Sequence, residues 1–296
     1  MLDRSSIKTH IECMNKLPAS TRAQILRCLV EGNSIRATGR LCNVEKRTVT
    51  HLLIDAGRAC QAYQDQNLND LPCKRVQVDE IWSFVYSKQK NVASAKAAPE
   101  GAGDAWTWTA ICADTKLAIS WLVGERNAVY AHAFIHDVWE RLAGRVQLTS
   151  DGLGSYRDAV EQVFGIDVDY GQLVKSYGPS PEGEKRYSPA QCIGAKRVAV
   201  QGNPDDKHIS TSFVERQNLT MRMAMRRFTR LTNAFSKKLE NHSYAVSLHF
   251  MNYNFCRVHM SLNGQTPAMA AGKADHVWTL EEVVGLLEPA KMLKAN

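Results

Sequence analysis

Apolar residues in the first seventy positions recur at the spacing of amphipathic helices. One face of the first predicted helix carries four of them: Ile25, Leu26, Leu29 and Val30. Apolar residues three and four positions apart line one side of a helix, and Gly32 ends this one. The pattern predicts two further short helices over residues 34–42 and 46–56, the second ended by Gly57. We therefore expect three helices joined by tight turns.

The tight turns between these helices suggest a helix-turn-helix unit. Gly39 is a small residue in the first helix of that unit, and Asn43 tolerates the left-handed conformation of the turn. A plain three-helix bundle that binds nothing shows the same pattern, so both interpretations stay open. If the unit binds DNA, the third helix is its recognition helix. The candidate groove and phosphate contacts on that helix are Lys46, Arg47, Thr50 and His51.

Beyond Pro72, strand-like and helical patterns alternate. Strands are predicted over residues 75–85, 106–113, 117–124 and 146–150, and helices over 128–143 and 156–164. The order strand-strand-strand-helix-strand-helix is that of the ribonuclease-H-like fold, a mixed sheet flanked by helices. The expected fold class is therefore α/β, with an all-α helix-turn-helix module at the N-terminus.

The second half of the chain reads as one long connection followed by helices. Residues 175–208 are expected to form a functional insertion without regular structure. Helices are predicted over residues 211–235, 240–256 and 280–287, the last introduced by a capping box of Thr279 and Glu282. With 296 residues, 44% of them hydrophobic, the chain can bury a sizeable core and a smaller module. The expected division is a helix-turn-helix module (1–70), a catalytic domain (74–260) and a helical tail (261–296).

Three acidic residues stand in different local settings. Asp79 lies in the first predicted strand, Asp151 ends the fourth, and Glu215 begins a helix. Each alone has an ordinary explanation as a solvent-facing strand residue, a turn residue or a charge favoured at a helix N-terminus. Together, two strand carboxylates and one helix carboxylate can hold two Mg²⁺ ions, with Mn²⁺ able to substitute, and cut a phosphodiester. We predict Asp79, Asp151 and Glu215 as catalytic residues and metal ligands.

Strand alternation favours Asp79 over its neighbour Glu80. One face of the strand is apolar apart from Glu80: Val76, Val78, Glu80, Trp82 and Phe84. Successive side chains of a strand point to opposite faces, so this set is expected to pack under helices. The other face carries polar residues beside Asp79, as a metal-facing surface would. Glu80 then needs a buried partner, for which an arginine from a covering helix is expected.

Positive charge is concentrated after Glu215. The chain has a formal charge of +7 and a pI near 9.0. Seven basic residues and no acidic one fall between positions 216 and 238: Arg216, Arg222, Arg226, Arg227, Arg230, Lys237 and Lys238. On one predicted helix, Glu215, Asn218, Arg222 and Arg226 share a stripe. Charge alone favours a solvated helix face with acidic neighbours elsewhere in space, but the stripe suits a polyphosphate partner. We add Asn218, Arg222 and Arg226 to the predicted DNA contacts.

Several classes of protein are disfavoured. Eight cysteines without a C-x-x-C pair indicate reduced thiols rather than a disulfide framework. The N-terminus lacks an apolar signal region and no apolar run is long enough to span a membrane, so a cytoplasmic protein, nucleoid-associated when bound, is expected. No phosphate-binding P-loop is present, and no histidine is followed three residues later by the arginine that a tyrosine recombinase requires.

Several blocks of the sequence resemble the insertion-sequence-one family of bacterial transposases. The three acidic blocks are residues 78–83, 149–152 and 211–218, and two further similar blocks are residues 226–235 and 253–259. The resemblance covers roughly residues 75–272. It implies a transposase that recognises terminal inverted repeats through an N-terminal module and acts as a homo-oligomer on DNA. Many relatives carry a zinc ribbon before the helix-turn-helix, and no cysteine pair here can form one.

The expected function is that of an insertion-sequence DNA transposase. Water attacks at the transposon end, and the freed 3′-hydroxyl then attacks target DNA by direct phosphoryl transfer. The expected partner is double-stranded DNA, both terminal repeats and target. Two alternatives stay open: a nuclease of the same fold that cuts without strand transfer, and a catalytically inactive, domesticated DNA-binding regulator.

Overall fold

A computed structural model describes residues 16–178, 192–229 and 233–288 of the chain. The helices are α2 (Ala19–Val30), α3 (Ile35–Leu41), α4 (Lys46–Asn67), α5 (Ala128–Glu140), α6 (Gly154–Phe164), α7 (Ser212–Ala224), α8 (Leu239–Met251), α9 (Pro267–Ala270) and α10 (Leu280–Gly285). The strands are β1 (Arg75–Val85), β2 (Gly103–Cys112), β3 (Ala118–Gly124), β4 (Val146–Asp151), β5 (Val168–Tyr177) and β6 (Cys192–Gln201).

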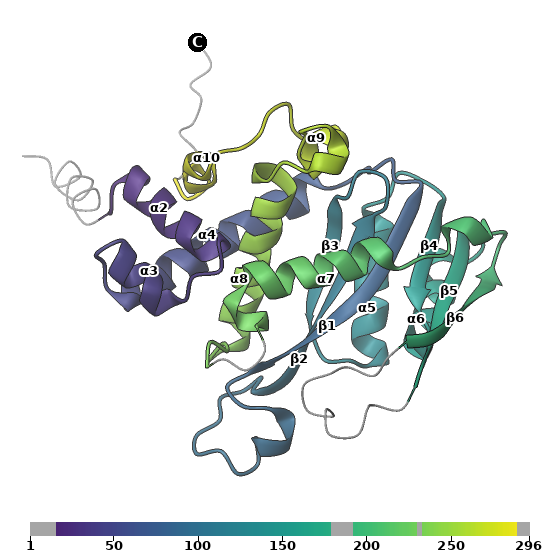
Figure 1. Cartoon of the computed structure of the whole chain (residues 1–296), viewed down its shortest axis with the longest axis horizontal. Coiled ribbons are helices and arrows are strands. Elements are labelled where there is room, and N and C mark those ends of the chain that lie inside the picture. The colour runs from purple at the N-terminus through teal and green to yellow at the C-terminus, as the bar shows by residue number, and fades with distance from the viewer. Residues whose placement is uncertain (1–15, 179–191, 230–232, 289–296) are drawn as a thin grey trace, which may run out of the picture.

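The strands form one mixed sheet in the order β3-β2-β1-β4-β5-β6. The pairs β1/β4 and β4/β5 are parallel, whereas β1/β2, β2/β3 and β5/β6 are antiparallel. Figure 1 shows α7 crossing one face of the sheet while α5 and α6 lie behind it. The predicted α/β class, a mixed sheet flanked by helices, is confirmed.

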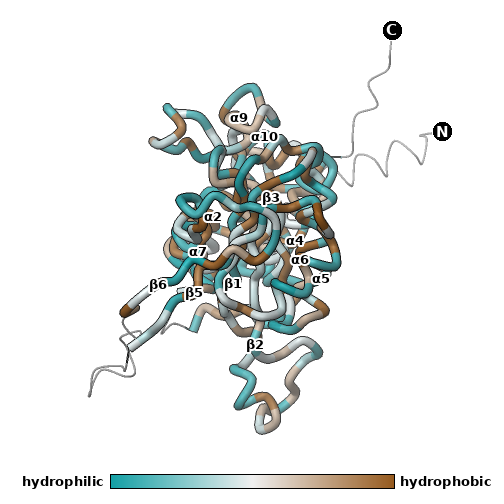
Figure 2. Tube along the Cα trace, turned by 90° about the vertical axis from the view of Figure 1, so that its right-hand side faces the viewer, coloured by the Kyte–Doolittle hydropathy of each residue, from teal (hydrophilic) through white to brown (hydrophobic). Residues whose placement is uncertain are grey.

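Both faces of the central strands are buried, which fixes the sheet between two helical layers. On one face the fully buried Trp108 packs against Phe134 of α5 and Tyr156 of α6, with ring centroids 6.0 and 5.4 Å apart. On the other face Trp121 stacks on Phe250 of α8 at 4.8 Å. In Figure 2, many of the brown, apolar stretches of the trace lie in the middle of the molecule, and many teal, hydrophilic stretches lie at its periphery. No described helix is long and apolar enough to cross a membrane.

The N-terminal helices lie as the sequence predicted, with one exception in length. Asn43 has a φ of 51° in the turn before α4, and both Val49 and Leu52 are buried. The prediction that the third helix ends at Gly57 is wrong, because α4 continues to Asn67. A Cβ at Gly57 would lie 2.3 Å from the carbonyl oxygen of Tyr244 in α8. The glycine therefore permits close helix packing rather than ending the helix.

We expect Gly57→Ala to destabilise the protein although alanine is the better helix former. The added methyl group would meet backbone and Cβ of Tyr244, which cannot move without shifting α8. Overpacking of this kind costs roughly 1–3 kcal/mol, more than the gain in helix propensity. Thermal unfolding measures it, and Gly144→Ala, where a Cβ has open space, is the control. A Gly57→Ala variant as stable as the control would contradict the close approach.

The C-terminal helix α10 packs against the first described helix. Leu280, Val283 and Val284 are buried in the core that also holds Ala23 and Leu26 of α2. At the edge of this contact, Arg22 donates to Glu288 at 2.7 Å. The predicted capping box of Thr279 and Glu282 is present. The division of the chain at residues 70–74 and 261 stays a prediction.

Two predictions for the region before and after Glu215 are wrong. Residues 175–208 are not all irregular, because β5 and β6 form an antiparallel pair, with Leu173 opposite Arg197; residues 179–191 lie outside the described part. β6 shows no alternation of buried and exposed residues, because it is an edge strand in which no residue is buried. The helix predicted to reach residue 235 stops at Ala224, where Met225 turns inward to a buried, extended position.

Candidate active site

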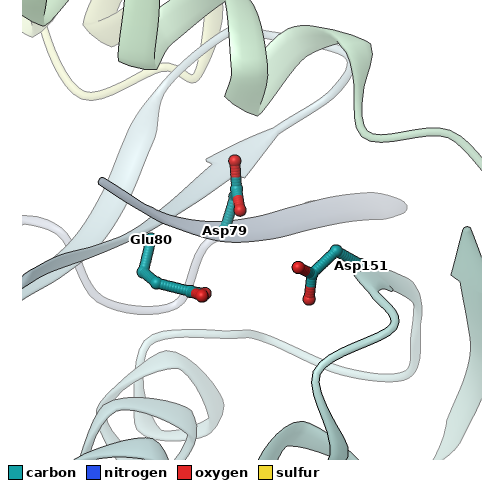
Figure 3. A group of neighbouring side chains, drawn as sticks. All are labelled: Asp79, Glu80 and Asp151. Carbon is teal, nitrogen blue, oxygen red and sulfur yellow. The ribbon is translucent and has the colours of Figure 1, made fainter. Parts of the chain in front are cut away.

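Asp79 and Asp151 lie side by side because their strands are parallel neighbours. The last paired residues of β1 and β4 are Gln77 and Thr149. Two residues further along each strand come Asp79 and Asp151, at equivalent positions on the same face. Figure 3 shows the carboxylate of Asp151 approaching from the end of β4 towards β1. Residues 72 positions apart in sequence therefore meet because of the crossover through α5.

Glu80 joins this pair from the opposite side of β1. One carboxylate oxygen from each of Asp79, Glu80 and Asp151 lies within 4.8 Å of the others, although Asp79 and Glu80 leave the strand in opposite directions (Figure 3). Glu80 is buried; its carboxylate accepts from Arg126 at 2.7 Å and from Tyr156 at 3.0 Å. The expected arginine partner is present, but it precedes α5 instead of lying in a helix.

The two faces of β1 are covered differently from what strand alternation predicts. The polar face is buried rather than open: Gln77 and Ser83 lie under α7 and α8, and Ser83 contacts His242 at 3.1 Å. On the face predicted to pack under helices, Trp82 and Phe84 are only half-buried. The covering helices reach Glu80 but not the end of the β1–β2 hairpin, which projects beyond them (Figure 1). The prediction that Trp82 and Phe84 pack under helices is therefore wrong.

The helix that carries Glu215 is held by the strand that carries Asp79. The side-chain oxygen of Gln77 accepts from the backbone N–H groups of Phe213 and Val214, at 2.8 and 3.2 Å. These are N–H groups of the first turn of α7, which have no partner within the helix. Three residues after Glu215, Asn218 donates to Asp79 at 2.8 Å. Strand and helix are thus fixed relative to each other on both sides of the carboxylates.

The surroundings of Asp79 disfavour the ionised form of its carboxyl group. Burial, followed by the charges of Glu80, Asp151 and Glu215, raises its pKa to about 8. Burial and Asp151 also raise the pKa of Glu80 despite its bonds to Arg126 and Tyr156. Carboxylates crowded in this way disfavour ionisation until a cation neutralises them. Clustered oxygen ligands of this kind are what Mg²⁺ and Mn²⁺ prefer, so the residues fit a divalent ion.

Glu215 lines the same cavity but is not part of the three-residue cluster. Its carboxylate accepts from the ammonium of Lys175 in β5 and from the hydroxyl of Thr211. The cavity, here called the acid cavity, has a volume of about 890 Å³. Its walls carry four carboxylates and three cations: Asp79, Glu80, Asp151, Glu215, Arg126, Lys175 and Arg222. A polyanion can therefore meet positive side chains around the acidic centre.

The other predicted DNA contacts gather at a second cavity. A cavity of about 940 Å³, here called the basic groove, is lined by Arg226 together with Lys46, Arg47, Thr50 and His51. Arg226 lies in the short turn Arg226–Phe228 rather than on α7, so the predicted four-residue stripe breaks after Arg222. Asn218 is buried and its side-chain amide donates to Asp79. It therefore does not lie at the surface position that the stripe predicted.

No protein-family model matches the chain, and no curated protein matches it. Solved structures with some likeness are Mos1 transposase complexes. The paired-end complex with the left transposon end has 12% identity and a TM-score of 0.21, over 53% of this chain and 59% of that chain. The paired-end complex with Mn has 10% identity and a TM-score of 0.25, over 80% and 76%. At such TM-scores the likeness supports no further argument.

Sequence patterns missed three residues that shape the site. Lys175 falls in a segment expected to lack regular structure, so nothing pointed to its contact with Glu215. Arg126 lies in a loop between a strand and a helix, where its pairing depends on the fold. Gln77 had a usable signal, since it sits two positions before Asp79 on the same strand face. Its bond to α7, however, joins residues 136 positions apart.

Proposed function

We propose that this protein is a DNA transposase that cuts the ends of an insertion sequence and joins them to target DNA. The supporting observation is the meeting of Asp79 and Asp151 from neighbouring parallel strands, in a cavity that Glu215 completes from α7. Three carboxylates from these elements were predicted as one site from their order in the sequence. A ribonuclease-H-like catalytic core and a helix-turn-helix module in residues 1–70 are parts of the same proposal.

Asp79, Asp151 and Glu215 are the proposed ligands of two Mg²⁺ ions, with Mn²⁺ as an alternative. Bound ions would supply a nucleophile at neutral pH and neutralise charge on the entering and leaving oxygens. Asn218 and Gln77 orient the carboxylates that do this, through the bonds to Asp79 and to α7. Before metal binds, the ammonium group of Lys175 donates to the carboxylate of Glu215 and balances its charge.

The test is strand cleavage and strand transfer on DNA duplexes made from the sequence that flanks this gene. We expect cleavage with Mg²⁺ at the end of a terminal inverted repeat, followed by joining of the free 3′-hydroxyl to a second duplex. Cleavage without joining would favour a nuclease of the same fold. Binding without cleavage in either metal would favour the inactive regulator. Flanking inverted repeats bounded by short target duplications are the corresponding observation in the DNA.

The two cationic regions should contribute differently to DNA binding. Arg47→Ala is expected to weaken binding to the transposon end more than to random DNA, if the third helix contacts bases. Arg222→Ala and Arg226→Ala should weaken both similarly and reduce the salt dependence by about one unit of slope per lost phosphate contact. Fluorescence anisotropy at several salt concentrations measures both effects. Equal losses on the two DNAs for Arg47→Ala would make that residue a phosphate contact.

A further inference from the structure

A row of half-buried aromatic side chains lies on the projecting β1–β2 hairpin. Trp82 and Trp106 are opposite each other in the β1–β2 register. Trp82 and Phe84 have ring centroids 5.8 Å apart, and Phe84 and Phe235 5.1 Å. Phe235 reaches this face because Ser236 pairs in parallel with Val85 beside the free edge of β1. We call Trp106, Trp82, Phe84 and Phe235 the aromatic strip; all four are half-buried.

Three cations interleave with these rings. The guanidinium of Arg126 lies 4.9 Å from the Trp106 ring centroid. The ammonium groups of Lys88 and Lys237 lie 5.7 and 5.3 Å from the rings of Trp82 and Phe235. These distances are within the range in which a ring attracts a cation. The strip therefore combines flat apolar surface with mobile positive charge.

The nearby acidic groups are already paired. Glu80 is buried and bonded to Arg126. Asp104, opposite Phe84 in the register, accepts from the backbone N–H of Gln89 at 3.1 Å. Among the described residues no carboxylate forms an ion pair with Lys88 or Lys237, so these two charges are available to a negatively charged occupant.

The strip also connects the two cavities described above. Arg126, at its Trp106 end, lines the acid cavity. Phe235 and Lys237, at its other end, line the basic groove. A polyanion that lies on the strip can thus continue from the carboxylate cluster to the cationic side chains of α4.

We propose that the aromatic strip binds unpaired, single-stranded DNA next to the bond that the acid cavity cuts; this rests on the proposed function. Bases have apolar faces that stack on aromatic rings, and every base offers such a face. In a duplex those faces are hidden, so rings beside cations favour a separated strand. Lys88 and Lys237 move from the rings to phosphates as bases take their place, which their long stems allow.

The experiment uses the full chain in EDTA, so that binding is measured without catalysis. The probe is an oligothymidylate of about 10 nucleotides, within the usual site size of single-strand binders. We expect binding by fluorescence anisotropy, together with quenching of tryptophan fluorescence. Trp82→Leu and Phe84→Leu should each weaken binding about five-fold or more, as loss of one stacked base does, and Trp82→Leu should lose part of the quenching.

Two matched controls separate stacking from damage to the fold. Trp139, an exposed ring on α5, is away from the strip, so Trp139→Leu should bind like the wild type. If Trp82→Leu proves unstable, Lys88→Gln keeps all four rings and should still weaken binding. Lys90→Gln removes a charge two residues away that contacts no ring within the described residues, and it should have the smaller effect.

Several results would overturn the inference. One is oligothymidylate binding that is unchanged in Trp82→Leu, Phe84→Leu and Lys88→Gln. Another is a wild type that cleaves duplex DNA with Mg²⁺ but does not bind the oligonucleotide, which would leave the proposed function intact. A third is a dimer, seen by analytical ultracentrifugation, that only the strip variants dissociate. Oligonucleotide binding through the strip without any cleavage would support the inference and count against the transposase proposal.

Discussion

Asp79→Asn, Asp151→Asn and Glu215→Gln should each abolish Mg²⁺-dependent strand cleavage while duplex binding survives. Each change removes a negative charge from the acid cavity and leaves the cationic side chains in place. Loss of transition-state charge stabilisation costs on the order of 10²–10³-fold in rate for a single hydrogen-bond donor, and a metal ligand should cost at least as much. Gel assays of cleavage, with anisotropy for binding, measure the two effects on the same samples.

Glu80→Gln is the matched control, because it changes a neighbouring carboxylate of the same cluster. The Arg126 and Tyr156 bonds hold Glu80 in place, so its loss should mainly reduce stability, by roughly 1–3 kcal/mol, with a modest effect on rate. If Glu80→Gln abolishes cleavage and Asp79→Asn leaves it near normal, the assignment of the two residues is reversed. Near-normal cleavage in Asp151→Asn or Glu215→Gln would remove that residue from the site.

Without divalent ions, Asp79→Asn should be more stable than the wild type at pH 8 and equal to it at pH 4. The pKa of Asp79 is raised from 3.8 to about 8 in the folded protein. In the folded protein this carboxyl disfavours its charged form, so stability is highest below pH 4 and is lost as pH rises towards 8. Asparagine never ionises and avoids the loss. The expected difference in melting temperature at pH 8 is on the order of 10 °C.

Mg²⁺ should reverse this difference, because it neutralises the carboxylates of the wild type. Thermal unfolding across pH 4–8, with and without Mg²⁺, separates the contributions. Only the difference between variant and wild type is compared, since other groups titrate in both. If the wild type and Asp79→Asn have the same melting temperature at every pH in EDTA, ionisation of Asp79 does not destabilise the fold. A Mg²⁺ effect of equal size in both proteins would place the ion elsewhere.

The sequence predicted those parts of the site that depend on local pattern. The alternation in β1 and the turn after β4 located Asp79 and Asp151, and the strand order of the first four strands made them neighbours. The Arg partner of Glu80 followed from the cost of a buried, unpaired carboxylate. These inferences need only periodicity and the general rules of sheet packing.

The remaining parts depend on long-range packing, which periodicity does not encode. The helix of Glu215 ends at Ala224 because Met225 and Phe228 turn into the core, and no local signal marks that point. β6 was missed because an exposed edge strand lacks buried alternate positions. Gly57 looked like a helix end because glycine usually is one, whereas its role comes from a contact with a helix nearly two hundred residues later.

The packing of α10 on α2 has a consequence for the order in which the chain folds during synthesis. The apolar face of α2 is complete only when residues 280–284 cover it, about 250 residues after α2 itself (280 − 30 = 250). At 5–20 residues per second this delay is roughly 10–50 s. A nascent chain therefore carries its first helices with part of their apolar surface exposed while these 250 residues are made. The first helices reach their final packing only after residues 280–284 have been synthesised.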